Sequence, residues 1–118
     1  MKQLLLYLFI LISSFSYAQE SSKDLDEIKK LIIKETRTEG TLDFFTPIKG
    51  KENDGYEIKP GVYASYREMA LYKWAKSVKD FGIDDLEELY TLYSEARNKE
   101  VTPMEKSLLK MGFNKELE

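Results

Sequence analysis

The chain has 118 residues, a formal net charge of −3, no histidine and no cysteine. Its length fits one ordinary domain. The absence of both residue types excludes a Ser-His-Asp triad, a thiolate nucleophile, a disulfide bond and any metal site built on His or Cys. Because the charge is mildly acidic and dispersed, we predict no nucleic-acid partner.

Residues 1–18 have the pattern of a cleavable secretory signal peptide. Lys2 is their only charged residue, residues 4–12 are apolar without interruption, and small residues precede the cleavage site. A membrane-spanning helix needs about 20 apolar residues, so we interpret this run as a signal and not as an anchor. We predict cleavage after Ala18, a single small helical domain over residues 19–118 with no membrane span, and a secreted or periplasmic location.

The first predicted helix spans residues 22–38. Its apolar positions recur at helical spacing and form one stripe: Leu25, Ile28, Leu31 and Ile32. Ser21, followed three residues later by Asp24, resembles a capping box. Gly40 is the predicted stop of this helix.

Residues 41–62 differ from the rest of the chain, because three glycines and two prolines fall among them. The tripeptide Asn53-Asp54-Gly55 is typical of a turn. Residues 42–46 before it and 56–58 after it could pair as a short ribbon, whereas the prolines argue against a central strand. The sequence leaves two alternatives open, an ordered long loop or a short β-ribbon.

The second predicted helix follows Pro60-Gly61 and ends near Phe81. Its main apolar face comprises Tyr63, Ala70, Leu71, Trp74, Val78 and Phe81. Gly82 stands where a left-handed residue ends a helix in a Schellman motif. Trp74 lies on the apolar face, so we expect it to be buried with its indole N–H bonded to a partner.

Two further helices follow. Asp84 as N-cap and Glu87 as its capping-box partner predict the start of the third helix, which has the clearest apolar stripe in the chain. Thr102 and Glu105 predict a capping box at the start of the fourth helix, and Gly112 predicts its end. The predicted fold class is therefore all-α, a small four-helix domain with a long loop or short β-ribbon between helices one and two.

Paired carboxylates of the kind that glycoside hydrolases use are available in one acidic cluster: Asp80, Asp84, Asp85, Glu87 and Glu88. We prefer a structural interpretation, because acids in a first helical turn favour its positive dipole end. Neither this cluster nor the turn at residues 53–55 has EF-hand spacing, and the glycines match no nucleotide or phosphate fingerprint. We predict no metal, no cofactor and no enzymatic activity.

One side of the second helix carries Tyr66, Met69 and Tyr72, interleaved with lysines. In one interpretation the helix is central and this side is also buried, with Arg67 paired to an acid. In the other, it is an exposed surface that binds a partner, since Tyr, Met and Arg are enriched at interfaces.

The neighbours Phe44 and Phe45 lie in an extended segment, so their side chains should point to opposite sides. We expect one ring to anchor the loop and the other to face outward. The candidate binding residues are Phe44, Phe45, Tyr66, Met69, Tyr72 and Lys73. The resulting hypothesis is a non-enzymatic protein-binding module, such as an inhibitor, immunity or accessory factor, of the bacterial periplasm or cell exterior. The alternative is a carbohydrate- or peptidoglycan-active protein that uses surface aromatics and a carboxylate pair.

Overall fold

The structure, a computed structural model, describes residues 24–118. The chain divides into two units between Lys30 and Leu31, and each is described by itself. In the first unit, residues 24–30 are helical. The predicted signal peptide, its cleavage site and the predicted cap at Ser21 lie outside the described residues. Between residues 24 and 118, no helix is long and apolar enough to cross a membrane.

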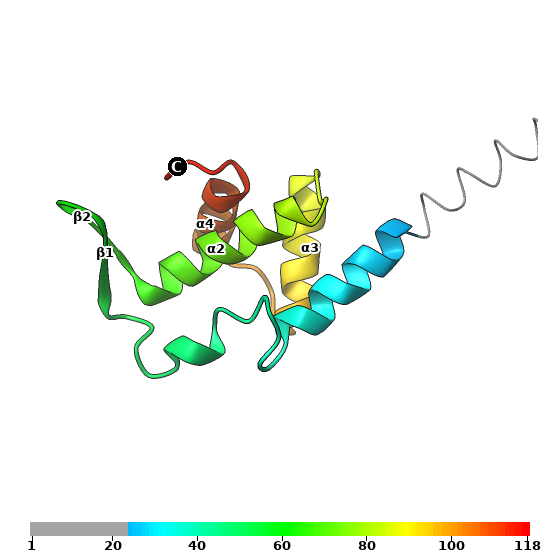
Figure 1. The fold of residues 1–118 in the computed structure, drawn as a ribbon, viewed down its shortest axis with the longest axis horizontal. Coiled ribbons are helices and arrows are strands. Elements are labelled where there is room, and N and C mark those ends of the chain that lie inside the picture. Colours follow the sequence, from blue (N-terminus) through cyan, green and yellow to red (C-terminus); the bar gives the residue numbers. More distant parts are fainter. Residues whose placement is uncertain (1–23) are drawn as a thin grey trace, which may run out of the picture. The chain divides into compact units, whose positions relative to one another are not determined.

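The second unit contains helices and one small sheet (Figure 1). Residues 31–36 are helical, and the elements that follow are η1 (Thr46–Ile48), β1 (Gly55–Lys59), β2 (Val62–Ser65), α2 (Tyr66–Asp80), α3 (Leu86–Arg97) and α4 (Pro103–Phe113). The described part of the chain is therefore mostly helical, as predicted, but a two-stranded antiparallel sheet precedes α2. Of the two alternatives for residues 41–62, the structure has the short ribbon.

This ribbon turns at a different place from the one predicted. β1 pairs with β2, with Tyr56 opposite Ala64, so the turn is at Pro60-Gly61 and not at residues 53–55. Proline sets the first turn position and Gly61, with φ +80°, supplies the left-handed one. The expected pairing of residues 42–46 was wrong. Tyr63, expected on the helix face, lies in β2 and is 67% exposed.

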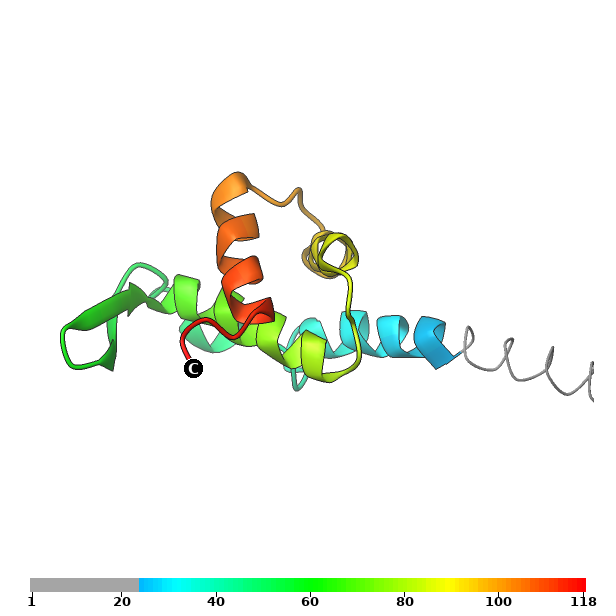
Figure 2. The ribbon, with the colours of Figure 1, turned by 90° about the horizontal axis from the view of Figure 1, so that it is seen from above.

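The three later helices run in three different directions, and α4 packs across α2 (Figures 1 and 2). Gly112 makes this crossing close, because a Cβ added there would lie 2.2 Å from the backbone oxygen of Tyr72. The prediction that Gly112 ends the fourth helix was wrong, since α4 continues to Phe113 and the positive φ falls on Lys115. The glycine is needed for packing and not for a turn.

Trp74 lies in the centre of the core and is fully buried. Its Nε1–H donates to the Thr36 hydroxyl at 2.9 Å, and that hydroxyl donates to the Ile32 carbonyl oxygen. The Tyr93 ring meets the indole edge-on, with centroids 5.5 Å apart. Burial and a bonded indole N–H were both predicted and are confirmed. The other large apolar side chains that are fully buried in the described part of the chain are Ile32, Leu71, Val78, Ile83, Leu89 and Leu109.

Two predicted helix boundaries, the end of α2 and the start of α4, agree with the structure. Gly82, which follows the C-cap residue Phe81 of α2, has φ +116°, and the Thr102–Glu105 capping box is present, so both predictions are confirmed. A second capping box, between Ser65 and Glu68, starts α2 and was not predicted from the sequence. α2 therefore begins only at Tyr66, because the residues before Tyr66 belong to β2.

Two other predicted helix ends were wrong. The N-cap of α3 is Asp85 and not Asp84, and it makes no side-chain capping bond. The helical residues before the ribbon end at 36 and not at 38, and the left-handed residue that follows is Glu39 and not Gly40. Gly40 instead allows the chain to pass close to Glu35, because an added Cβ would lie 2.1 Å from its carbonyl oxygen.

Candidate functional sites

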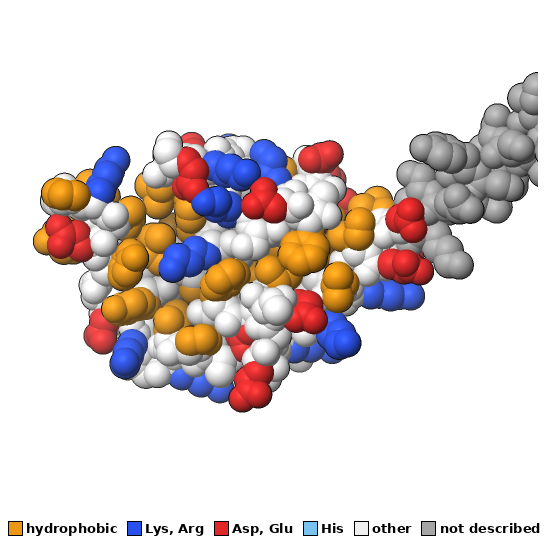
Figure 3. All heavy atoms as spheres, in the orientation of Figure 1, with side chains coloured by type: hydrophobic (Ala, Val, Ile, Leu, Met, Phe, Trp, Pro, Cys, Tyr) orange, Lys and Arg blue, Asp and Glu red, His pale blue; other side chains and the backbone are white. Residues whose placement is uncertain are grey.

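A groove of about 240 Å³ contains four of the six predicted binding residues. Phe44 comes from the loop before η1, and Tyr66, Met69 and Lys73 come from one face of α2, at spacings of three and four residues. The other residues that line it are Asp43, Pro47, Ile48, Tyr56 and Ala70. We call this the Phe44 groove. Hydrophobic side chains with interspersed Lys and Arg also cover the face of α2 and the segment beside it in Figure 3.

The aromatic wall of the Phe44 groove is formed by two elements that are adjacent only in the fold. Tyr56 of β1 and Tyr66 of α2 have ring centroids 5.7 Å apart. The Lys73 ammonium lies 5.7 Å from the Tyr56 ring centroid, a distance typical of a cation–π contact. The groove therefore combines apolar and aromatic walls with one positive charge.

Asp43 holds the loop that carries Phe44. Its buried carboxylate accepts hydrogen bonds from the backbone N–H groups of Glu39, Phe45 and Thr46, at 2.9 to 3.2 Å, and from the Thr46 hydroxyl. Burial tends to raise the pKa of Asp43, but these hydrogen bonds outweigh it and lower the pKa below its usual value. The loop is thus ordered by a charged side chain at its base.

The remaining two predicted binding residues, Phe45 and Tyr72, are buried and do not line the groove. Phe45 points to the other side of the loop and meets Tyr93 edge-on, with centroids 6.1 Å apart. One ring was expected to anchor the loop, and the burial of Phe45 confirms this, although Phe45 has helical dihedral angles (φ −95°, ψ −38°) and does not lie in an extended segment. The Tyr72 hydroxyl donates to Glu118 at 2.7 Å and accepts from the Leu117 N–H at 2.9 Å. The interpretation of a buried second side of α2 therefore holds at Met69 and at Tyr72, where the C-terminal residues bond to the hydroxyl.

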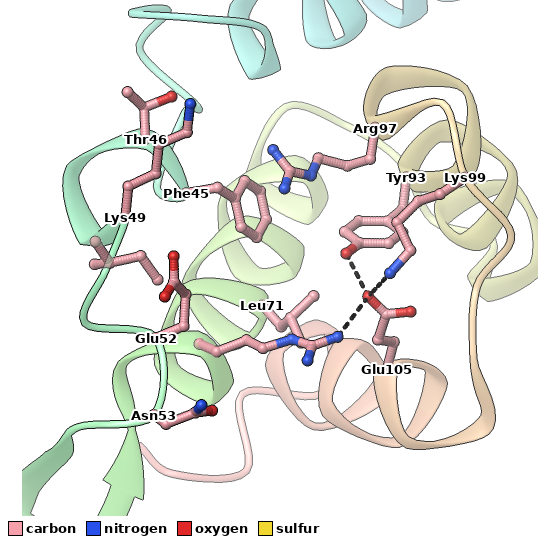
Figure 4. A pocket seen from close by; sticks show the side chains of 12 residues that line it. Phe45, Thr46, Lys49, Glu52, Asn53, Leu71, Tyr93, Arg97, Lys99 and Glu105 are labelled. Carbon is pink, nitrogen blue, oxygen red and sulfur yellow. Dashed lines mark hydrogen bonds and ion pairs between the residues drawn. The ribbon is translucent and has the colours of Figure 1, made fainter.

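A second concave site surrounds Glu105, which is fully buried. Its Oε2 accepts hydrogen bonds from the Tyr93 hydroxyl at 2.6 Å and the Lys99 ammonium at 2.7 Å (Figure 4). The Arg67 guanidinium lies 3.6 Å from the same oxygen, as expected for an arginine that pairs with an acid. Oε1 accepts the Thr102 backbone N–H at 3.0 Å and so completes the helix cap.

These interactions determine the ionisation of both buried groups. Burial tends to raise the pKa of Glu105, but the bonds from Lys99, Tyr93 and Thr102 outweigh it and lower the pKa to about 2. Burial, followed by the contact with the Glu105 carboxylate, raises the pKa of Tyr93 above its usual value. At neutral pH, Glu105 is therefore a carboxylate and Tyr93 a neutral hydrogen-bond donor.

The site beside Glu105 is a pocket of about 420 Å³, which we call the Glu105 pocket. Four cations line it (Lys49, Arg67, Arg97 and Lys99), together with two carboxylates (Glu52 and Glu105). The remaining lining residues are Phe45, Thr46, Ile48, Asn53, Leu71 and Tyr93. Sequence reasoning missed this pocket, because its charged residues are scattered over the chain and follow no local pattern. The one available signal was Arg67, whose place on an apolar helix face required an acidic partner.

The carboxylates of the Glu105 pocket do not suit glycoside hydrolysis. That chemistry needs one acid that stays protonated near neutral pH. The pKa of Glu52 is lowered by hydrogen bonds from backbone N–H groups, including that of Gly50, and the pKa of Glu105 is lowered as described above. In the acidic cluster predicted from the sequence, Asp80 pairs with Lys115 at 3.0 Å. No group of three acidic side chains among residues 24–118 is arranged to hold a metal ion.

No protein-family model matches the chain, and no curated protein or solved structure is significantly similar to it. The functional proposals below therefore rest on the residues of the two concave sites and on their chemistry.

Proposed function

We propose that the protein is a non-enzymatic protein-binding module whose Phe44 groove holds one large apolar side chain of a partner protein. The observation that carries the proposal is the convergence of Phe44, Tyr66, Met69 and Lys73 on one groove from two separate segments. Aromatic residues and methionine are enriched at interface cores. A groove of about 240 Å³ suits a single anchor side chain better than an extended ligand.

The chemistry of the groove also indicates what lies beside the anchor. Among the described residues, Lys73 is the only cation that lines it, and its side chain is exposed. The Asp43 carboxylate is already engaged by four hydrogen bonds to its own loop. We therefore propose that an acidic residue follows or precedes the anchor in the partner, so that it pairs with Lys73. The ordered loop reduces the entropy lost on binding, because Phe44 is held in place before the partner arrives.

We also propose that the module acts outside the cytoplasm, in the periplasm or at the cell exterior. This proposal rests on the signal-peptide pattern of residues 1–18. Intact-mass measurement of the exported protein tests it, and the expected product begins at Gln19. A full-length chain held stably in the membrane would contradict it.

The binding proposal is tested by capture of the partner from the native cell envelope with tagged protein, followed by affinity measurement with the purified partner. Phe44→Ala and Lys73→Glu should each weaken binding, Phe44→Ala by about 2 kcal/mol or more, as hot-spot truncations do. Tyr63→Ala is the control, because Tyr63 is an exposed aromatic residue of β2 that does not line the groove.

The far-ultraviolet circular dichroism of each variant shows whether the helices remain. The proposal predicts lost binding with an unchanged spectrum for Phe44→Ala and Lys73→Glu, and full binding for Tyr63→Ala. Unchanged affinity of both groove variants would refute it. Retention by isolated peptidoglycan, abolished by the same two substitutions, would instead support the carbohydrate-binding alternative.

A further inference from the structure

The Glu105 pocket has a charge opposite to that of the chain as a whole. It is lined by four cations and two carboxylates, which leaves two positive charges in excess, whereas the formal net charge of the chain is −3. A concave site in which one sign of charge is in excess attracts ions of the other sign. The pocket is thus suited to an anion.

Two of the four cations are already paired, and two are not. Lys99 and Arg67 share the Glu105 carboxylate. Within the described residues, by contrast, no carboxylate oxygen lies within 4.0 Å of the charged groups of Arg97 or Lys49. Arg97 and Lys49 are therefore the groups that can receive a ligand.

Three of the cations are also held in place before any ligand arrives. The Arg97 guanidinium lies 4.2 Å from the centroid of the Phe45 ring, and Figure 4 shows the two side chains next to each other. Glu105 fixes Lys99 and orients Arg67. Because a guanidinium has five N–H donors in a rigid fork, both arginines retain donors for a carboxylate or phosphate oxygen.

The uncharged lining indicates the rest of the ligand. Ile48, which is half-buried, and Phe45, which is 8% exposed, provide the accessible apolar surface, because Leu71 and Tyr93 are almost fully buried. We propose that the Glu105 pocket is a second binding site, which takes a small organic dianion with an apolar ring or chain. Its charged end contacts Arg97 and Lys49, and its apolar part lies against Ile48 and Phe45.

Calorimetric titration of the full chain with three probes at constant ionic strength tests this proposal. Phenyl phosphate carries both the ring and the charge, inorganic phosphate only the charge, and benzyl alcohol only the ring. We expect saturable binding of phenyl phosphate, at least about tenfold weaker binding of inorganic phosphate, and none of benzyl alcohol. No saturable binding of phenyl phosphate would overturn the proposal, and so would equal affinity for the two phosphates.

Three variants locate the binding in the pocket. Lys49→Gln and Arg97→Gln should each weaken phenyl phosphate binding by about tenfold, as expected for loss of a charge-assisted hydrogen bond. Lys110→Gln is the matched control, because Lys110 is an exposed lysine of α4 outside the pocket. If Lys110→Gln weakens binding as much as Lys49→Gln does, the protein responds to general charge and the proposal is wrong.

A fourth variant has the opposite expected effect, which a merely structural role would not produce. Glu52→Gln removes one negative charge from the pocket, while the amide oxygen can still accept the Gly50 N–H bond that Glu52 makes at 2.9 Å. Phenyl phosphate should therefore bind more tightly to this variant, and weaker binding would contradict the proposed position of the ligand. Phe44→Ala should leave phenyl phosphate binding unchanged, so this test is independent of the protein-binding proposal.

Discussion

Replacement of Glu105 by glutamine removes the charge at the centre of the buried network while keeping the shape of the side chain. The carboxylate uses one oxygen for Tyr93, Lys99 and Arg67 and the other for the Thr102 N–H. An amide has only one oxygen. Whichever way the glutamine is oriented, its NH₂ group faces either the Thr102 N–H or the donors of Tyr93 and Lys99, so one side of the network is lost.

The size of the effect follows from the pKa of Glu105. The folded protein lowers this pKa from 4.5 to about 2, and each pKa unit corresponds to about 1.4 kcal/mol. The ionised carboxylate therefore contributes about 3 kcal/mol to the free energy of unfolding at pH 7. Ordinary domains have about 5–15 kcal/mol, so Glu105→Gln should still fold but should be clearly less stable.

The pH dependence distinguishes this electrostatic effect from a packing defect. Because the folded pKa is depressed, the stabilisation is fully present above the unfolded pKa of 4.5 and is lost as the pH falls towards 2. The difference in unfolding free energy between the natural protein and Glu105→Gln should thus be about 3 kcal/mol at pH 7 and should shrink as the pH is lowered. Urea titrations followed by Trp74 fluorescence measure it.

The control is Glu95→Gln, since Glu95 is exposed on the same α3 helix that carries Tyr93. This substitution should change stability by less than about 0.5 kcal/mol at any pH. A stability difference for Glu105→Gln that stays constant from neutral to acidic pH would refute the reasoning, because it would show that the charge of Glu105 is not what stabilises the fold.

Three further predictions concern the core and the helix ends. Gly112→Ala should lower the unfolding free energy by about 1–3 kcal/mol, because the added Cβ collides with the Tyr72 backbone oxygen. This cost should outweigh the preference of alanine for helices. A higher melting temperature would contradict the close helix crossing. Gly82→Val should lower the unfolding free energy by about 1–2 kcal/mol, and Gly82→Asn should lower it less. Nothing lies within 4 Å of an added Cβ, so only the backbone is strained. Identical melting curves for the two variants would show that no left-handed residue is needed. Trp74 should emit at short wavelength in the folded state and shift to the red on unfolding, and Trp74→Ala should cost about 3–5 kcal/mol; solvent-like emission from the folded protein would contradict its burial.

The sequence determined those features that depend on a few neighbouring residues. The Thr102–Glu105 capping box and the left-handed Gly82 are local, because each satisfies backbone groups within one helical turn. That Phe44 and Phe45 line different cavities was also expected, but alternation along an extended segment is not the reason, because Phe45 has helical dihedral angles. The burial of Trp74 followed from its place on the apolar face of α2.

Only the tertiary structure decided features in which one local signal has two uses. A glycine near a helix end can supply a left-handed residue or allow close packing, and Gly112 has the second role because α2 crosses α4 there. Similarly, Pro60-Gly61 and Asn53-Asp54-Gly55 are both turn signals, and the pairing of β1 with β2 selects the first. Sequence periodicity does not show which neighbour will occupy the adjacent space.

Both concave sites depend on contacts between residues far apart in the chain. Tyr93 and Arg97 of α3 contact Phe45. These contacts between distant segments of the chain decided that Phe45, and not Phe44, faces the core. In the same way, the sequence identified Glu105 as a helix cap, but the fold placed Arg67 and Tyr93 against its carboxylate. A cap needs only the backbone of its own helix, whereas a charged pocket needs several chain segments to meet, and their meeting is a property of the packed core.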